Sequence, residues 1–92
     1  MNYSLIDPIL NPWADKNGLN VQTEFKESEV RSINIVSPQG RRFQLWVDGV
    51  DDSGNTAVHA WDLRKRRCDF QCDVQQLASK LDEAYKQVQI WF

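Results

Sequence analysis

The chain has 92 residues, a length that suits one domain built around one hydrophobic core. Hydrophobic residues make up 41% and charged residues 26%, which excludes a disordered chain, because such a chain is poorer in the former and richer in the latter. The 11 Lys and Arg are outnumbered by 13 Asp and Glu, so the formal net charge of -2 argues against general binding to nucleic acid or to an anionic membrane.

Residues 1–18 predict an irregular N-terminal arm with at most one helical turn. Asn11 is suited to cap such a turn, Pro12 to take its first position, and Asn17-Gly18 to end it. We expect Trp13 to anchor the arm to the body of the protein.

A β-meander of four to five strands is predicted for residues 19–72. Strict alternation of apolar and polar residues marks the first segment, and β-branched residues mark the second. The third also alternates, but with Trp46 on its polar side. Short stretches that suit hairpin turns separate the segments, and short connections favour antiparallel pairing because parallel strands need a long crossover. The expected strands are residues 19–26, 30–36, 41–50, 56–63 and 68–72.

The periodicity of the fourth strand does not orient it. Val58 and Ala60 fall on one face, and the residues on the other are Ala57, His59, Trp61 and Leu63. Both faces therefore have apolar character, and the sequence leaves open which of them meets the core.

A C-terminal helix is predicted for residues 73–92. Asp73 is a good N-cap, and Gln76 three positions later completes a capping-box pair. Apolar residues recur at helical spacing. They are Leu77, Leu81, Ala84, Val88 and Trp91. The predicted fold class is therefore α+β, in a single domain of residues 1–92: an antiparallel β-meander of four to five strands with one long C-terminal helix packed on one sheet face.

Cys68 and Cys72 are the only cysteines of the chain. In an extended strand this spacing places them on one face about 13 Å apart, which is too far for a disulfide. With the single histidine, His59, they also fall short of the four ligands of a structural zinc site. We expect two reduced, buried thiols, no metal and no cofactor.

A cytoplasmic location is expected. The first 15 residues contain no Lys or Arg and are interrupted by prolines, unlike a secretory signal. No apolar run approaches the roughly 20 residues of a membrane-spanning helix, so we expect no membrane insertion. Reduced thiols also suit a reducing compartment.

No catalytic constellation is expected. The chain has one imidazole, His59, and lacks a Gly-x-Ser-x-Gly elbow, a glycine-rich phosphate loop and a His-Glu-x-x-His motif. Asp48, Asp51 and Asp52 adjoin or belong to a hairpin loop, where Asp is favoured for the hydrogen bonds it accepts from the local backbone. We therefore expect a protein that is not an enzyme and has no catalytic residues.

Two tryptophans of neighbouring strands mark a candidate binding surface. If the third and fourth strands pair through the loop 51–55, Trp46 and Trp61 lie near each other, beside Arg42 and on the face that carries His59. Trp and Arg together are typical of interface hot spots. In the alternative interpretation, the N-terminal arm folds over this face and makes it a second small core.

The basic run 64–67 is the sharpest local feature of an otherwise acidic chain. One interpretation is contact with nucleic-acid phosphates. A second, which we favour over nucleic acid, is a solvated turn whose cations pair with nearby Asp62, Asp69 and Asp73. A third is engagement of an acidic protein surface.

The stretch Ala60-Trp61-Asp62-Leu63-Arg64-Lys65-Arg66 and the hairpin from Arg41 to Trp46 are the parts of the chain that carry a family resemblance. In these stretches, in size and in element order, the chain resembles the small cytoplasmic immunity proteins of bacterial polymorphic toxin systems. The resemblance implies a protein that binds one toxin domain and blocks it, either by covering its active site or by preventing its closure.

We therefore expect a non-catalytic protein-binding inhibitor, an immunity protein that neutralises a cognate toxin domain or another single target. Its partner-binding residues are expected to be Trp46, Trp61, His59, Arg42, Arg64, Lys65, Arg66 and Arg67. The alternative is a small nucleic-acid-binding regulatory module, in which the basic turn 64–67 holds phosphates and the exposed aromatics stack on bases. A homodimer formed through an edge strand or the aromatic face is a third hypothesis.

Overall fold

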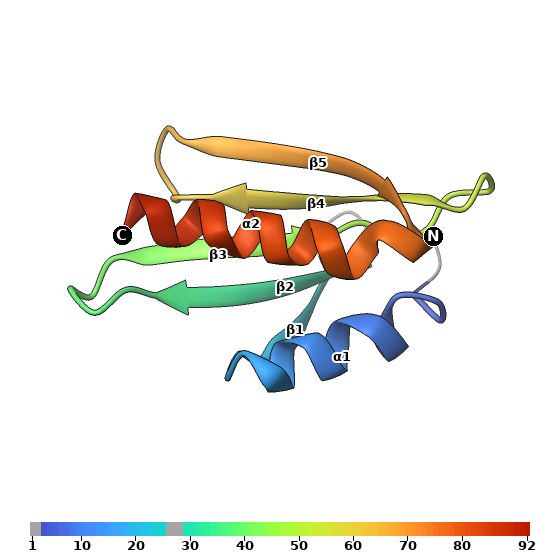
Figure 1. Cartoon of the computed structure of the whole chain (residues 1–92), viewed down its shortest axis with the longest axis horizontal. Helices are drawn as coiled ribbons and strands as arrows, with labels where there is room; N and C mark the ends of the chain where they lie inside the picture. The colour runs from blue at the N-terminus through green and yellow to red at the C-terminus, as the bar shows by residue number, and fades with distance from the viewer. Residues whose placement is uncertain (1–2, 26–28) are drawn as a thin grey trace.

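The computed structural model describes residues 3–25 and 29–92 (Figure 1). Five strands form one antiparallel sheet, in which each strand pairs with its neighbours in the sequence. The predicted α+β meander is therefore confirmed. The elements are α1 (Asp7–Lys16), β1 (Val21–Phe25), β2 (Glu29–Val36), β3 (Arg42–Val47), β4 (Asn55–Trp61), β5 (Arg67–Asp73), the 3-10 turn η1 (Val74–Gln76) and α2 (Leu77–Trp91).

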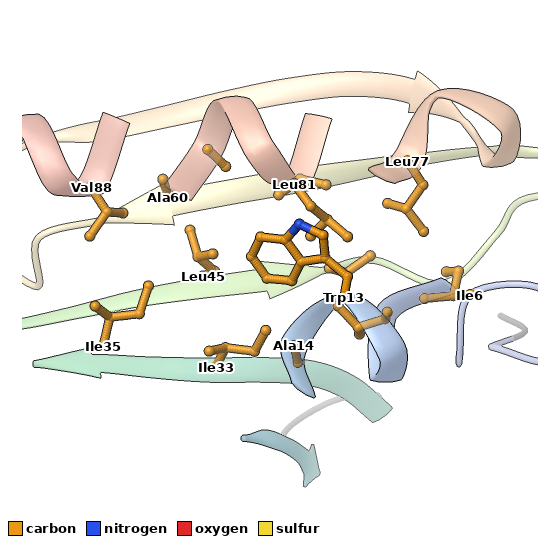
Figure 2. Packing of buried hydrophobic residues seen from close by; sticks show 14 of the residues in the cluster. Ile6, Trp13, Ala14, Ile33, Ile35, Leu45, Ala60, Leu77, Leu81 and Val88 are labelled. Atoms are coloured by element: carbon orange, nitrogen blue, oxygen red, sulfur yellow. The ribbon is translucent and has the colours of Figure 1, made fainter. Parts of the chain in front are cut away.

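Both helices lie on the same face of the sheet, α2 over β3 to β5 and α1 beside it toward β1 (Figure 1). The hydrophobic core fills the space between these two layers, and Figure 2 shows Ile33, Leu45 and Ala60 of the sheet directed at α2 and α1. Because alternate residues of a strand point to opposite faces, the residues between these core positions lie on the other face. No helix or strand of the described residues covers that other face.

The first turn of the C-terminal helix forms as its capping signal predicts. The Asp73 carboxylate accepts a hydrogen bond from the Gln76 N–H at 2.9 Å, and the Gln76 side chain accepts one from the Asp73 N–H at 3.4 Å. Trp91 is buried at the end of the stripe, where its ring stacks on Phe43 at a centroid distance of 6.5 Å. The stripe from Leu77 to Trp91 thus belongs to the core, as the spacing indicates.

The prediction of an irregular N-terminal arm is wrong for the residues that the structure describes. Residues 7–16 form the ten-residue helix α1, with Pro8 in its first turn and Pro12 inside it. Pro8 is the helix-start signal, since a proline suits the first turn of a helix. Pro12 lies inside the helix and has no N–H to donate to the Pro8 carbonyl. Asn17 ends the helix, as expected.

Trp13 anchors α1 to α2, which confirms its predicted role. Its indole Nε1–H donates to Asp82 Oδ1 at 2.8 Å, and its ring meets Tyr85 edge-on at 5.9 Å. A second tie joins α1 to the sheet, because Arg31 forms a two-pronged ion pair with Asp7 at 3.0 and 3.1 Å. Neither helix in the described part of the chain has the length and apolar character of a membrane span.

The two cysteines lie on β5, on the face that α2 covers. Cys72 is buried and Cys68 is half-buried, and both thiols are free. Burial raises the pKa of the Cys72 thiol, with the charge of Asp73 adding to the effect.

Candidate functional site

The uncovered side of the sheet, which we call the open face, is built from alternate residues of five paired strands. The register aligns Ser32, Trp46, His59 and Asp69 in one row across β2 to β5. The next row consists of Asn34, Gln44, Trp61 and Arg67. This register orients β4: its Val58 and Ala60 meet the core, while His59 and Trp61 belong to the open face.

Four residues of the open face form what we call the aromatic cluster: Trp46, His59, Trp61 and Arg67. The Trp46 ring stacks on the His59 ring, with centroids 4.6 Å apart and planes 19° from parallel. Trp61 meets Trp46 edge-on at 6.4 Å, and the Arg67 guanidinium lies 5.0 Å from the centre of the Trp46 ring. The predicted proximity of Trp46 and Trp61 is therefore observed.

The N-terminal arm does not cover this cluster. The buried residues Ile6, Leu10 and Trp13 of the arm pack into the core between the sheet and α2. The interpretation of the aromatic face as a second small core is thus wrong, and both tryptophans stay partly exposed.

His59 lies between two carboxylates. Its Nδ1 is 2.5 Å from Asp69 Oδ1 and its Nε2 is 2.8 Å from Asp48 Oδ2. Burial of the ring opposes protonation, but the hydrogen bonds and charges of Asp48 and Asp69 outweigh it and raise the pKa of His59 above 6.5. The bond from His59, together with that from Arg67, lowers the pKa of Asp69.

This arrangement makes His59 a support for the surface. The residue is 7% exposed, Trp46 lies on its ring and both nitrogens are engaged. A ring so engaged has no unoccupied nitrogen with which to take a proton from a substrate. His59, which we predict to touch a partner, therefore lies beneath the residues that are accessible.

The remaining predicted cations gather at one end of the molecule, around the turns 37–41 and 62–66. Arg42 and Arg64 line a hollow of 360 Å³ together with Arg41. The other lining residues are Gly40, Asp62 and Leu63. We call Arg41, Arg42, Arg64, Lys65 and Arg66 the basic end.

The predicted pairing of the basic run with three carboxylates is observed for one pair. Arg67 Nε lies 2.9 Å from Asp69 Oδ1. Asp62 instead accepts hydrogen bonds from the backbone N–H groups of Arg64 and Arg66, at 2.8 and 3.0 Å, and so shapes the turn. The run therefore divides into Arg67, which belongs to the aromatic cluster, and residues 64–66, which belong to the basic end.

Sequence reasoning left four neighbouring residues out of the candidate site. Asp48 and Asp69 hold His59, although Asp48 was expected only to serve a turn. Val36 and Leu63 add apolar surface beside the basic end, with 62% and 39% of their areas exposed. For Asp48 the available signal was its place two residues after Trp46. Val36 and Asp69 reach this face only through the strand register, and Leu63 lies beyond the end of β4.

Compared with protein-family models, curated proteins and solved structures, the chain gives no match. The interpretation of the site consequently rests on its own geometry.

Proposed function

We propose that the chain is a non-catalytic protein-binding inhibitor of the immunity-protein kind, which docks its open face on a cognate toxin domain. The observation that carries the proposal is the aromatic cluster, two tryptophans and an arginine on a sheet face without a covering layer. Trp and Arg are the residue types that dominate the affinity of protein interfaces, particularly where charged groups surround them.

Rigidity of the cluster supports the same proposal. Trp46 is held by stacking on His59, which in turn is fixed by Asp48, just after β3, and by Asp69 of β5. A surface that is ordered before binding loses little conformational entropy in the complex, so more of the contact energy becomes affinity.

A partner-capture experiment tests the proposal. Tagged wild-type chain and a Trp46→Ala/Trp61→Ala variant are used to capture proteins from nuclease-treated extract of the native cells. We expect one stoichiometric protein with the wild type and its loss with the variant. Coexpression then tests inhibition: the captured protein should arrest growth alone and be neutralised by the wild-type chain.

Two further variants make the result specific. Ile90→Ala removes an exposed apolar residue of α2, away from the open face, and should keep the partner. Asn34→Arg adds bulk to the open face without removing a packed ring and should lose it. The proposal would be contradicted if Trp46→Ala/Trp61→Ala and Asn34→Arg both kept the partner. It would also be contradicted if the chain left the activity of the captured protein unchanged.

The basic end favours a second candidate, nucleic-acid binding. Arg42 and Arg64 face a shared hollow, and the structure gives no ion pair for residues 64–66 among the residues it describes. Single-stranded oligonucleotides offer phosphates to such cations and bases to Trp46 and Trp61. Fluorescence anisotropy with labelled oligonucleotides tests this candidate: binding that weakens steeply with salt supports it, and no binding at low salt removes it.

A further inference from the structure

β5 is an edge strand with an unbroken pairing side. Its seven residues pair with β4 in continuous register, without a bulge or proline to blunt the edge. The Asp62 N–H donates to the Arg66 carbonyl at 3.1 Å and so continues the β4–β5 ladder. By alternation, the backbone groups of Arg67, Asp69 and Gln71 point outward, where no other described strand lies. Such an edge is a template for another strand.

We propose that β5 pairs with β5 of a second copy of this chain, antiparallel and two-fold symmetric about Phe70. The sequence of the strand, Arg-Cys-Asp-Phe-Gln-Cys-Asp, is complementary to itself in this register. It places Arg67 opposite Asp73, Cys68 opposite Cys72, and Asp69 opposite Gln71 of the second copy. This inference goes beyond the proposed function, because it concerns the backbone edge of β5, although Arg67 belongs to both the edge and the aromatic cluster.

The backbone permits this register and the charges select it. The outward-pointing Asp69 and Gln71 become partners that exchange N–H···O=C bonds across the two-fold axis. Moving the two-fold axis by one residue, to Asp69 or to Gln71, would place Asp69 opposite Asp69, or opposite Asp73, of the second copy. Directly opposed like charges destabilise a strand pair, so the register about Phe70, which pairs all seven residues of β5, is favoured over these two neighbouring registers.

The side chains at the ends of β5, Arg67 and Asp73, have hydrogen-bonding groups available for a second copy. Arg67 is 53% exposed and uses Nε for Asp69, which leaves its terminal N–H groups for Asp73 of the second copy. Asp73 accepts the Gln76 N–H through Oδ1, and its other oxygen is available to Arg67. At the centre, the half-buried Phe70 gains a second Phe70 ring as neighbour.

The two cysteines give a direct test of the register. Opposed residues that do not exchange hydrogen bonds have Cα atoms about 4.5 Å apart, within the range that a disulfide bridges. Cys68 and Cys72 of the second copy form such a pair. Two copies of the same cysteine would instead be offset by about 13 Å along the strands.

Cys68→Ala and Cys72→Ala variants, each with one thiol left, are oxidised with diamide separately and as an equimolar mixture. In each cross-link, two thiols lose two hydrogen atoms to diamide and one S–S bond forms. We expect a cross-linked dimer from the mixture and at least tenfold less from either variant alone. The proposal would be overturned if either variant alone cross-linked as much as the mixture, or if the mixture did not cross-link at alkaline pH.

Sedimentation velocity under reducing conditions provides a second test. The wild type should sediment as a dimer of the 10.7 kDa chain. Gln71→Pro removes an outward N–H and none of the β4–β5 bonds, so it should give a folded monomer, while Gln71→Thr should remain a dimer. A monomeric wild type over the micromolar range, or a Gln71→Pro chain that is folded by circular dichroism and still dimeric, would refute the β5 interface.

Discussion

The stability of the fold depends on the protonation of His59. Its pKa is raised, because the bonds and charges of Asp48 and Asp69 outweigh the burial of the ring. The stability that it contributes is therefore fully present below its unfolded-state value near 6.5 and is lost as the pH rises through the higher folded-state value. Asp69, whose pKa is lowered from 3.8, contributes stability above that value and loses it as the pH falls through its folded-state value.

The expected consequence is a free energy of unfolding that is largest between about pH 4 and 6.5 and falls toward pH 9. Urea unfolding at several pH values measures it. In His59→Gln the fall above pH 6.5 should largely disappear, with an overall cost of about 1–2 kcal/mol from the lost charged hydrogen bonds. His59 is the single histidine, so its NMR titration assigns the pKa without ambiguity. A titration midpoint below 6.5 would contradict the arrangement.

Leu63 is a residue in a costly backbone conformation. Its φ of 65° lies in the left-handed region, which costs a residue with a Cβ about 1–2 kcal/mol, and its side chain is partly exposed. Leu63→Gly should therefore raise the free energy of unfolding by about 0.5–1 kcal/mol, after the entropy that glycine adds to the unfolded chain. The urea midpoint measures this, with Leu63→Ala, which keeps the Cβ, as the control. An equal effect of the two substitutions would show that backbone strain is not the cause.

At the scale of elements, replacing Trp13 and replacing Trp61 compare the stability that comes from packing between helices with that from the open face. Trp13→Ala should cost about 3–5 kcal/mol, because it removes a buried ring that joins α1 to α2. Trp61→Ala, on the open face, should cost about 1 kcal/mol. Chemical denaturation compares the two free energies of unfolding. Trp13→Phe keeps an aromatic ring and removes the hydrogen bond to Asp82, so it should lower the free energy of unfolding by about 1 kcal/mol. Similar costs for Trp13→Ala and Trp61→Ala would place the aromatic cluster in a second core.

The elements show which features the sequence could predict. Alternation of period two located the strands, and the Asp73–Gln76 pair located the start of the C-terminal helix, because both signals are local. The helix α1 was not predicted because Pro12 was assigned as its start, whereas the helix begins at Asp7 with Pro8 in its first turn. The contact of His59 with Asp69 depends on the β4–β5 register, which joins residues ten apart and leaves no local periodicity.

At the scale of the whole molecule, charge is distributed unevenly. The basic end collects five of the 11 cations, and an acidic loop at 51–55 joins β3 to β4 at the opposite end of the sheet (Figure 1). A local field of this kind attracts anions even when the net charge is negative. Capture of a partner through the open face would therefore be accompanied by steering through the basic end.

Chromatography on immobilised heparin measures this asymmetry without a partner. The wild type should be retained at low salt, and the triple variant Arg64→Glu/Lys65→Glu/Arg66→Glu should pass through. The matched control is the helix variant Lys16→Glu/Lys80→Glu/Lys86→Glu, with its three changes in α1 and α2. Each reversal changes the charge by two, so both variants have a net charge of -8 in place of -2. The helix variant should keep most of the retention. Loss of retention in both would show that net charge, rather than the basic end, determines binding.

The placement of both helices on one side divides the residues of each strand into two sets. Along β3, Phe43, Leu45 and Val47 are constrained by the core, whereas Gln44 and Trp46 face outward. Replacements in the outward set alter the displayed chemistry and leave the interior intact. A sheet of this kind can change the chemistry that it displays at every second position of a strand while its scaffold stays the same.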